Sequence, residues 1–250
     1  MYPAIQIGQA LLPTFGVVFA IAMIAAVVLC VARARQYGMG RVTALVAALA
    51  ALCAGVLGDR VMNDALLAHL GRTIPSVAFA AGVATAALAV KVWSLMVGAR
   101  FSLLADCLSQ PVALALAAVR LGCLLAGCDY GQPTDRVWGI AFNNALALAW
   151  YRTPIGVRLH PTQLYECLLA VTLLCLLKLM ERRQLRNGVQ FLSLAAAYSF
   201  GRFLIDFLRG DAGRGFWGPL SVPQWFCVLT LVISALQLTL LSRQKAVAAR

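Results

Sequence analysis

Arg120 is a charged residue inside the apolar run from Leu104 to Ala126. A lone arginine at the centre of a membrane span costs about 2.5–3.5 kcal/mol, so it either extends to the lipid headgroups or faces a partner inside the protein. Gly122 and Gly127 would let a second helix approach closely, which favours the interior position. There the planar guanidinium would suit a phosphate group.

A second apolar segment carries Tyr198, Arg202, Asp206 and Arg209. Their spacing places all four on one stripe of a helix. An ion pair between Arg202 and Asp206 would account for the acid. It does not account for two arginines around a single acid, so the segment predicts a surplus positive charge that suits an anionic ligand.

The third segment, His-Pro-Thr-Gln-Leu-Tyr-Glu, runs from His160 to Glu166. Pro161 suits the first turn of a helix, with His160 as the cap and Gln163 as a capping-box partner. We expect His160, Tyr165 and Glu166 to converge at the start of this helix. The chain has two histidines, so we predict no metal centre and interpret His160 as a hydrogen-bond donor or proton carrier.

The sequence also predicts no cofactor, because it contains no phosphate-binding glycine loop, dinucleotide fingerprint or serine nucleophile motif. The glycine-rich segment 210–215 is interpreted as a flexible loop. Of the eight cysteines, only Cys123 and Cys128 flank a polar turn. They would form a disulfide, hold a thiol near Arg120, or pack as small apolar side chains, and packing is favoured.

The composition indicates which elements position these residues. The chain has 62% hydrophobic and 12% charged residues, with a mean hydropathy of +0.85. A soluble domain has about 25% charged residues, so these values exclude an ordinary soluble protein, a disordered chain and a nucleic-acid-binding domain. They predict an all-α, polytopic membrane protein with a single domain over residues 1–250.

Apolar runs of membrane-spanning length predict seven helices. We place them at Leu12–Ala32, Val42–Leu57, Ser76–Val97, Leu104–Ala126, Pro161–Met180, Val189–Leu208 and Pro223–Leu241.

The basic residues predict the orientation of these spans. If the amino terminus is outside, the cytoplasmic loops receive most of the lysines and arginines, including Arg33 and the cluster Glu181–Arg186. We expect that cluster to set the topology and contact lipid headgroups. The carboxyl terminus is then cytoplasmic. The outer face keeps Arg120, Arg202 and other arginines that topology does not require, so something else must hold them there.

Three motifs resemble the prolipoprotein diacylglyceryl transferase family. The stretch Arg120–Gly131, Arg-Leu-Gly-Cys-Leu-Leu-Ala-Gly-Cys-Asp-Tyr-Gly, is similar to the family signature. His160–Glu166 matches the family's His-Pro-(Ser/Thr)-Gln-Leu-Tyr-Glu, and Tyr198–Arg209 resembles its Tyr-Gly-x-x-Arg-Phe-x-x-Glu-x-x-Arg helix. The motifs occur in the family's order, and seven spans with an outside amino terminus also fit.

Besides Asp206, which replaces the glutamate of the last motif, the chain departs from the family at two places. The signature carries two asparagines and a glutamate where this chain has Cys123, Ala126 and Cys128. The His-Gly-Gly segment of the third span is replaced by Ala80, Ala81 and Gly82, so the family's catalytic histidine is missing. These departures bring the acceptor, or the mechanism, into question.

The resemblance implies transfer of a diacylglyceryl group from phosphatidylglycerol to the lipobox cysteine of a prolipoprotein signal peptide, with release of glycerol phosphate. It implies a multi-pass enzyme of the bacterial inner membrane that contacts membrane lipids and no nucleic acid. The implied catalytic residues are Arg120, Arg202 and His160. The implied substrate-binding residues are Gly122, Gly127, Tyr130, Gly131, Gln163, Tyr165, Glu166, Tyr198, Asp206 and Arg209. Among these, Glu166 and Asp206 would orient arginines.

The sequence also fits two alternatives. A divergent paralogue would use a phospholipid donor with another acceptor, as the missing histidine suggests. A lipid-binding or transporting membrane protein would hold phosphatidylglycerol in the same pocket and release it unchanged.

Overall fold

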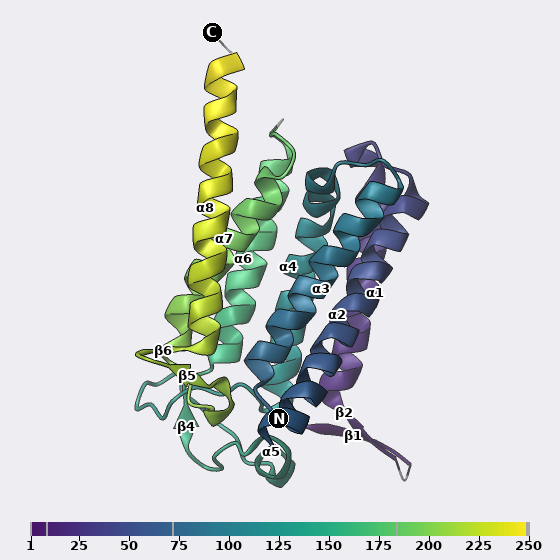
Figure 1. The fold of residues 1–250 in the computed structure, drawn as a ribbon. Helices are drawn as coiled ribbons and strands as arrows, with labels where there is room; N and C mark the ends of the chain where they lie inside the picture. The colour runs from purple at the N-terminus through teal and green to yellow at the C-terminus, as the bar shows by residue number, and fades with distance from the viewer. Residues whose placement is uncertain (1, 9, 72, 184, 249–250) are drawn as a thin grey trace.

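The computed structural model describes residues 2–8, 10–71, 73–183 and 185–248, and most of them are helical. The long helices lie side by side in a bundle, with the amino terminus near one end and the carboxyl terminus at the other (Figure 1). In chain order they are α1 (Thr14–Arg33), α2 (Arg41–Leu70), α3 (Pro75–Met96), α4 (Phe101–Ala126), α6 (Thr162–Glu181), α7 (Val189–Asp206) and α8 (Val222–Ala248).

Six of these helices are long and apolar enough to cross a membrane, and α7 is not among the helices that meet this description within the described residues. Helix α7 is less apolar because its 18 residues include Gln190, Arg202 and Asp206. The predicted second span is wrong in its extent, because α2 continues from Leu57 to Leu70. Hydropathy falls at Asp59 and Arg60, but polar residues of this kind still form helix.

A polar cap covers one end of the bundle and was not part of the all-α prediction. We define the cap as residues 127–161 and 207–221. It contains α5 (Ala145–Tyr151), the short 3₁₀ helix η2 (Ala212–Arg214), and two antiparallel ribbons. The ribbons pair β3 (Ile140–Ala141) with β4 (Arg158–Leu159) and β5 (Phe216–Trp217) with β6 (Leu220–Ser221). A hairpin of β1 (Ala4–Ile7) and β2 (Ala10–Pro13) leads into α1 at the same end (Figure 1).

Helix α4 is the central element, because it contacts α1, α3, α6 and α7. Small residues allow several helices to approach closely. A Cβ at Gly122 would lie 3.1 Å from Val18 Cγ1 of α1, and one at Gly82 would lie 2.7 Å from the Gly55 carbonyl oxygen of α2. Gly122 thus serves helix packing, as its spacing predicts.

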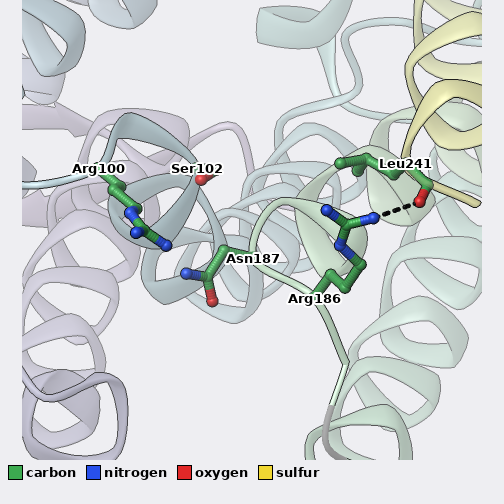
Figure 2. A pocket seen from close by; sticks show the side chains of 5 residues that line it. All are labelled: Arg100, Ser102, Arg186, Asn187 and Leu241. Atoms are coloured by element: carbon green, nitrogen blue, oxygen red, sulfur yellow. Dashed lines mark hydrogen bonds between the residues drawn. The ribbon is translucent and has the colours of Figure 1, made fainter. Parts of the chain in front are cut away.

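At the end opposite the cap, a cavity of about 380 Å³ lies between the loops before α4 and α7 and the end of α8. Arg100, Ser102, Arg186, Asn187 and Leu241 line it, and Arg186 Nη1 donates to the Leu241 carbonyl oxygen at 2.5 Å (Figure 2). This cavity contains none of the residues that the sequence motifs singled out.

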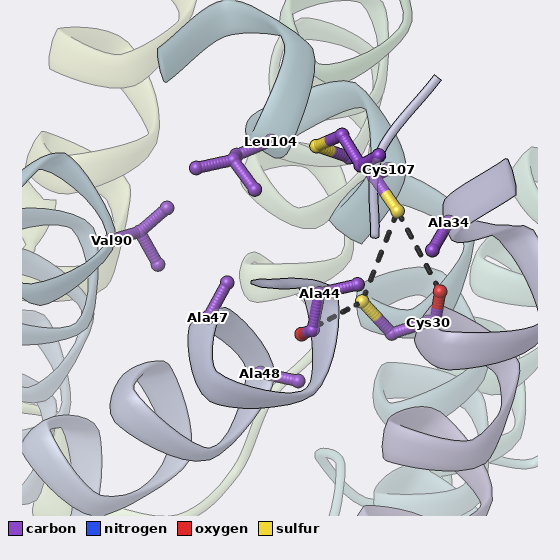
Figure 3. Close-up of a cluster of buried hydrophobic side chains, with 9 residues drawn as sticks. Cys30, Ala34, Ala44, Ala47, Ala48, Val90, Leu104 and Cys107 are labelled. Atoms are coloured by element: carbon purple, nitrogen blue, oxygen red, sulfur yellow. Dashed lines mark hydrogen bonds between the residues drawn. The ribbon is translucent and has the colours of Figure 1, made fainter. Parts of the chain in front are cut away.

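An apolar cluster also lies toward the end away from the cap. It includes Ala44, Ala47, Val90 and Leu104, together with the buried residues Cys30 and Cys107. The Sγ atoms of Cys30 and Cys107 are 3.9 Å apart (Figure 3). Both are free thiols that pack as small residues.

Arg33 and Glu181 form an ion pair between α1 and α6, which corrects the prediction that the Glu181–Arg186 cluster only sets topology and contacts headgroups. Arg33 Nη2 lies 2.8 Å from Glu181 Oε1, and the Arg33 side chain is 5% exposed. Arg33 also donates to Tyr37, and Gln110 donates to Glu181 Oε2. Their side chains therefore face the protein interior, with the exposed basic residues of this end around them.

Asp106 ties α4 to the start of α7. Its carboxylate accepts hydrogen bonds from the backbone N–H groups of Gly188, at 2.6 Å, and Phe191, at 2.9 Å. We expect Asp106→Ala to lower the free energy of unfolding by about 2–4 kcal/mol, because a helix cap is lost and buried donors are left unpaired. Thermal unfolding in detergent tests this. Asp106→Asn, which keeps one acceptor, should recover part of the loss; equal stability of the alanine variant and the parent would contradict the prediction.

Candidate active site

Arg120, Glu166 and Arg202 come from three helices, α4, α6 and α7, and meet where the bundle joins the cap. Arg120 Nε lies 2.8 Å from Glu166 Oε2, and Arg202 Nε lies 3.3 Å from the same oxygen. The Glu166 side chain is 1% exposed. Tyr198 Oη donates to Glu166 Oε2 at 3.4 Å. One buried carboxylate therefore aligns both arginines that the sequence singled out.

Asp129, in the turn after α4, is the second carboxylate that joins two arginines. Its carboxylate oxygens pair with Arg120 Nη1 and Arg209 Nη2, each at 2.5 Å. Burial on its own would raise the pKa of Asp129, but Arg209 and Arg120 outweigh it and hold this pKa well below its ordinary value. Asp129 is therefore ionised at neutral pH, and its stabilising ion pairs are lost only in strong acid.

Asp206 is the third carboxylate that joins two arginines. Arg202 Nη1 lies 2.7 Å from Asp206 Oδ1, which confirms the predicted ion pair within α7. Arg214 Nη1 lies 3.0 Å from Asp206 Oδ2, and Ser221 Oγ donates to that oxygen. Helix α7 ends at Asp206, so Arg209 lies just beyond the helical stripe, but its side chain still joins the same group.

These contacts form one connected set, which we call the arginine–carboxylate network. Its members are Arg120, Arg202, Arg209, Arg214, Asp129, Glu166, Asp206 and Asp211.

The network is formally neutral, with as many carboxylates as arginines, so the predicted surplus of positive charge is wrong for the described site. The prediction counted only the acid within α7 against its two arginines, while folding also brings Glu166 of α6 and Asp129 and Asp211 of the cap to the arginines. The ion pairs use Nε and Nη1 of both Arg120 and Arg202. The remaining nitrogen of each guanidinium, Nη2, takes part in none of these ion pairs. An anionic ligand therefore has a donor on each arginine that leaves the ion pairs intact.

The backbone of the cap holds this geometry. Residues Cys128–Gln132 lie between the ends of α6 and α7: Gln132 N donates to Leu208 O at 2.8 Å, and Gly131 N to His160 O at 3.1 Å. Gln163 Nε2 donates to the Cys128 carbonyl at 2.6 Å. The segment that carries Asp129 is therefore fixed from both sides.

Gly131 is required by close backbone approach, because a Cβ there would overlap the carbonyl oxygen and the Cβ of His160. We expect Gly131→Ala to lower the free energy of unfolding by about 1–3 kcal/mol, as other overpacking changes do. Thermal unfolding in detergent would measure it. Gly213→Ala is the matched control in the same cap, because nothing lies within 4 Å of its added Cβ. Equal shifts in the two variants would contradict this role for Gly131.

His160 and Tyr165 meet, as predicted, and their described side-chain contacts include no member of the network. His160 Nδ1 lies 3.2 Å from Tyr165 Oη, which also accepts a hydrogen bond from Trp138 Nε1 at 2.9 Å. Glu166 points instead to the arginines, so the predicted convergence of all three residues is wrong. The contacts described for the His160 ring are with Tyr165.

The predicted helix cap at His160 is also wrong. Helix α6 starts at Thr162, after Pro161, with no side-chain cap among its described contacts. Gln163 bonds to the turn after α4, so it positions the cap segment rather than the start of its own helix.

Tyr130 and Gly127 lie at the edge of the site. Tyr130 Oη donates to the Arg152 carbonyl at 3.1 Å, which directs it to α5. Burial, with a contribution from Asp211, raises the pKa of Tyr130, so it remains a neutral phenol. Gly127 ends α4 with a φ of 93°, a conformation that favours glycine.

Sequence reasoning missed Asp129, Asp211, Arg214 and Ser221 as site residues. The segment interpreted as a flexible loop contains η2, and Arg214 Nη2 donates to the Arg209 carbonyl at 3.0 Å. The count of acids on the outer face was the available signal, since buried arginines require partners.

The fold and the network define a class of protein: a polytopic helical membrane protein with a buried arginine-rich site at one end of its bundle. The sequence pattern of the prolipoprotein diacylglyceryl transferase family matches residues 3–240. The chain belongs to this family.

Several bacterial relatives are named phosphatidylglycerol–prolipoprotein diacylglyceryl transferase. The chain is 29% identical over 230 residues to the phosphatidylglycerol–prolipoprotein diacylglyceryl transferase of Clostridium tetani, covering 88% of this chain and 89% of the relative. It is 29% identical over 235 residues to transferase 2 of Clostridium perfringens, covering 88% and 87%. The transferase of Geobacter sulfurreducens is 34% identical over 148 residues, covering 58% and 54%.

Proposed function

We propose that this chain transfers a diacylglyceryl group from phosphatidylglycerol to the lipobox cysteine of a prolipoprotein, releasing glycerol phosphate. The observation that carries the proposal is the junction of Arg120, Glu166 and Arg202, because each residue comes from a different family motif and the three meet in one buried site. The transferases of Clostridium tetani and Clostridium perfringens carry this activity in their names.

The reaction is a displacement at carbon. The acceptor thiol loses its proton to His160, its sulfur forms a bond to the glyceryl CH₂ carbon, and the bond from that carbon to the phosphate oxygen breaks. The electron pair leaves with glycerol phosphate. Arg120 and Arg202 stabilise the charge that develops on the phosphate through donors outside the ion pairs. Such preorganised donors stabilise a transition state by about 2.7–4 kcal/mol each.

Glu166 and Asp206 orient the arginines, and Asp129 with Arg209 fixes the cap segment beside them. Tyr198 and Gln163 line the same region through their contacts with Glu166 and with the Cys128 carbonyl. Gly131 and Gly127 let the backbone adopt this arrangement. These assignments extend the family's motifs to the residues of this chain.

The topology is part of the proposal. Helix α7 lies beside α6 and α8 (Figure 1), and its ion pairs reduce the cost of its charged residues, so we count it as the seventh span. The basic loops then place the carboxyl terminus in the cytoplasm and the amino terminus and cap outside. The chain forms one domain in the bacterial inner membrane, with the network at the outer headgroup level.

The decisive experiment supplies phosphatidylglycerol and a lipobox peptide to the protein in proteoliposomes and measures release of glycerol phosphate. Release should require the peptide's cysteine and disappear in Arg120→Ala and Arg202→Ala. Arg183→Ala, an exposed arginine on the opposite end, is the matched control. Absence of release from the folded parent protein would reject the proposal.

His160 is assigned a proton-transfer role because it is the motif histidine that remains. His160→Asn is expected to reduce the transfer rate by about 10²–10⁴-fold, the usual contribution of a general acid or base. The rate of glycerol phosphate release measures this. Full turnover by the variant would eliminate the role and leave His160 as a partner of Tyr165.

A different acceptor is the second candidate, and the absence of the family's histidine from the third span favours it. Ala80, Ala81 and Gly82 occupy the place of the family's histidine segment, and Gly82 packs on the Gly55 carbonyl of α2. Assaying other thiols, amines and hydroxyls beside the lipobox peptide separates the candidates. A non-catalytic lipid-binding protein would instead bind phosphatidylglycerol through Arg120 and Arg202 and release it unchanged.

A further inference from the structure

The turn that closes α4 gathers two thiols and a carboxylate. One ligand atom each from Cys123, Cys128 and Asp129 lie within 4.8 Å of one another, and Cys123 Sγ is 3.5 Å from Asp129 Oδ2. All three belong to a single turn beside Arg120. The prediction of no metal centre rested on the number of histidines, but thiols and carboxylates also bind metal ions.

The backbone explains why the two sulfur atoms are close. Gly127 ends the helix in the left-handed conformation, and its N–H donates to the Cys123 carbonyl at 2.8 Å. This helix ending folds the second residue after the helix back over the last turn. Cys128 is therefore placed against Cys123 by the turn itself, without a disulfide.

We propose that Cys123, Cys128 and Asp129 bind one zinc ion and leave its fourth coordination position open for an acceptor thiol. Thiolate and carboxylate ligands suit Zn²⁺, and three protein ligands with an open position are typical of catalytic zinc sites. Ligand atoms around tetrahedral zinc lie roughly 3.4–3.8 Å apart. The group therefore closes on the ion with side-chain shifts of about 1 Å.

Neighbouring side chains hold Cys128 and Asp129 in position, as outer groups do around the ligands of metal sites. Ligating carboxylates are usually hydrogen-bonded by an outer group, and Asp129 already receives Arg120 and Arg209 on its two oxygens. Thr162 Oγ1 donates to the Asp129 carbonyl at 2.8 Å. The amide of Gln163 holds the Cys128 carbonyl, while Gln163 Oε1 is a buried acceptor without a hydrogen-bond partner among the described residues.

The net charge of the loaded site and its exposure to an acceptor thiol also suit a bound zinc ion. Two thiolates, one carboxylate and Zn²⁺ sum to a net charge of −1 beside two arginines, so the loaded site is not an isolated charge. Cys123 is buried, but Cys128 and Asp129 are partly exposed. A peptide thiol can therefore reach the ion from the side of the cap.

The site gives this chain a route to a nucleophilic sulfur without the family's histidine, an inference that rests on the proposed function. A thiol that coordinates zinc gives up its proton more readily, and His160, the proton carrier of the proposed function, accepts it and passes it to solvent. Its sulfur then bonds to the glyceryl carbon as the bond to the phosphate oxygen breaks, and glycerol phosphate leaves. No oxidation or reduction is involved.

The first experiment measures metal binding without lipid or peptide. The full chain in detergent is reduced, stripped with a chelator and titrated with Co²⁺, which reports thiolate ligation by an intense near-ultraviolet absorption. We expect one equivalent per chain, displaced by Zn²⁺. Cys123→Ser and Cys128→Ser should each weaken binding by at least 10-fold, while the double variant Cys53→Ser with Cys175→Ser, both exposed thiols, should bind like the parent.

No binding by the reduced chain, or equal binding by the parent, Cys123→Ser and Cys128→Ser, would overturn the site. The second experiment adds a lipobox peptide to the Co²⁺-loaded chain. A spectral change with the cysteine peptide and none with its serine analogue supports the open position, and no change with either peptide overturns that assignment. Because neither experiment uses phosphatidylglycerol, failure of the metal site is distinguishable from failure of the transferase proposal.

Discussion

Replacing Glu166 with glutamine is expected to destabilise the protein by about 3–5 kcal/mol, because a buried ion pair that loses one partner leaves an uncompensated charge. Glu166 contacts Arg120, Arg202 and Arg209, and its side chain is 1% exposed. Glutamine also directs an N–H₂ group toward guanidinium donors. In a chain of this length the loss corresponds to a fall in Tm of roughly 6–20 °C.

The same change should abolish transfer, since Arg120 and Arg202, the arginines of the proposed catalytic site, lose their common partner. Thermal unfolding in detergent and glycerol phosphate release are the two measurements. Glu181→Gln is the matched control, because Glu181 pairs with Arg33 at the opposite end of the bundle. It should cost stability and leave the rate of transfer by the folded fraction unchanged. A Glu166→Gln protein with parental Tm and rate would refute the central role of this carboxylate.

Arg202→Lys is expected to reduce the transfer rate by about 10²–10³-fold with a much smaller effect on folding. Arg202 binds Glu166 through Nε and Asp206 through Nη1, and still has Nη2 for the substrate phosphate. A lysine keeps the positive charge, but its single nitrogen is a point donor and cannot serve all three partners.

The readout for Arg202→Lys is glycerol phosphate release at saturating phosphatidylglycerol, compared with Tm in detergent. Arg183→Lys is the control, since that residue is exposed and away from the network. A lysine variant with parental activity would show that charge alone, without the planar fork, suffices at this position.

The sequence predicts the local parts of this site better than the contacts between elements. Arg202 and Asp206 were expected to pair because one helical turn separates them, and they do. Glu166 was expected near the start of its helix, and it lies there. Its partners come from α4 and α7, and no local sequence pattern specifies these contacts between helices. Asp129 lies at a φ of 57° in a turn, where neither hydropathy nor periodicity gives a signal.

For the fold as well, the sequence predicts local segments better than the contacts between them. Apolar runs predict where the long helices lie, because burial in lipid requires them. They do not predict that α2 reaches Leu70, since hydropathy reports contact with lipid and not helix length. The ribbons of the cap have two residues per strand, too few for alternation to be visible. Their pairing depends on backbone contacts across the site, such as Pro133 with Leu159.

The polarity of α7 has a consequence for how the protein is made. Helix α7 contains the charged residues Arg202 and Asp206 when it reaches the membrane during synthesis. Helix α6, which supplies Glu166, is synthesised before it. Pairing within α7 lowers the insertion cost, and docking onto α6 lowers it further. As the proposed seventh span, α7 would depend on these neighbours to enter the bilayer. The ion pairs of the arginine–carboxylate network would thus make the last stage of membrane insertion conditional on the earlier ones.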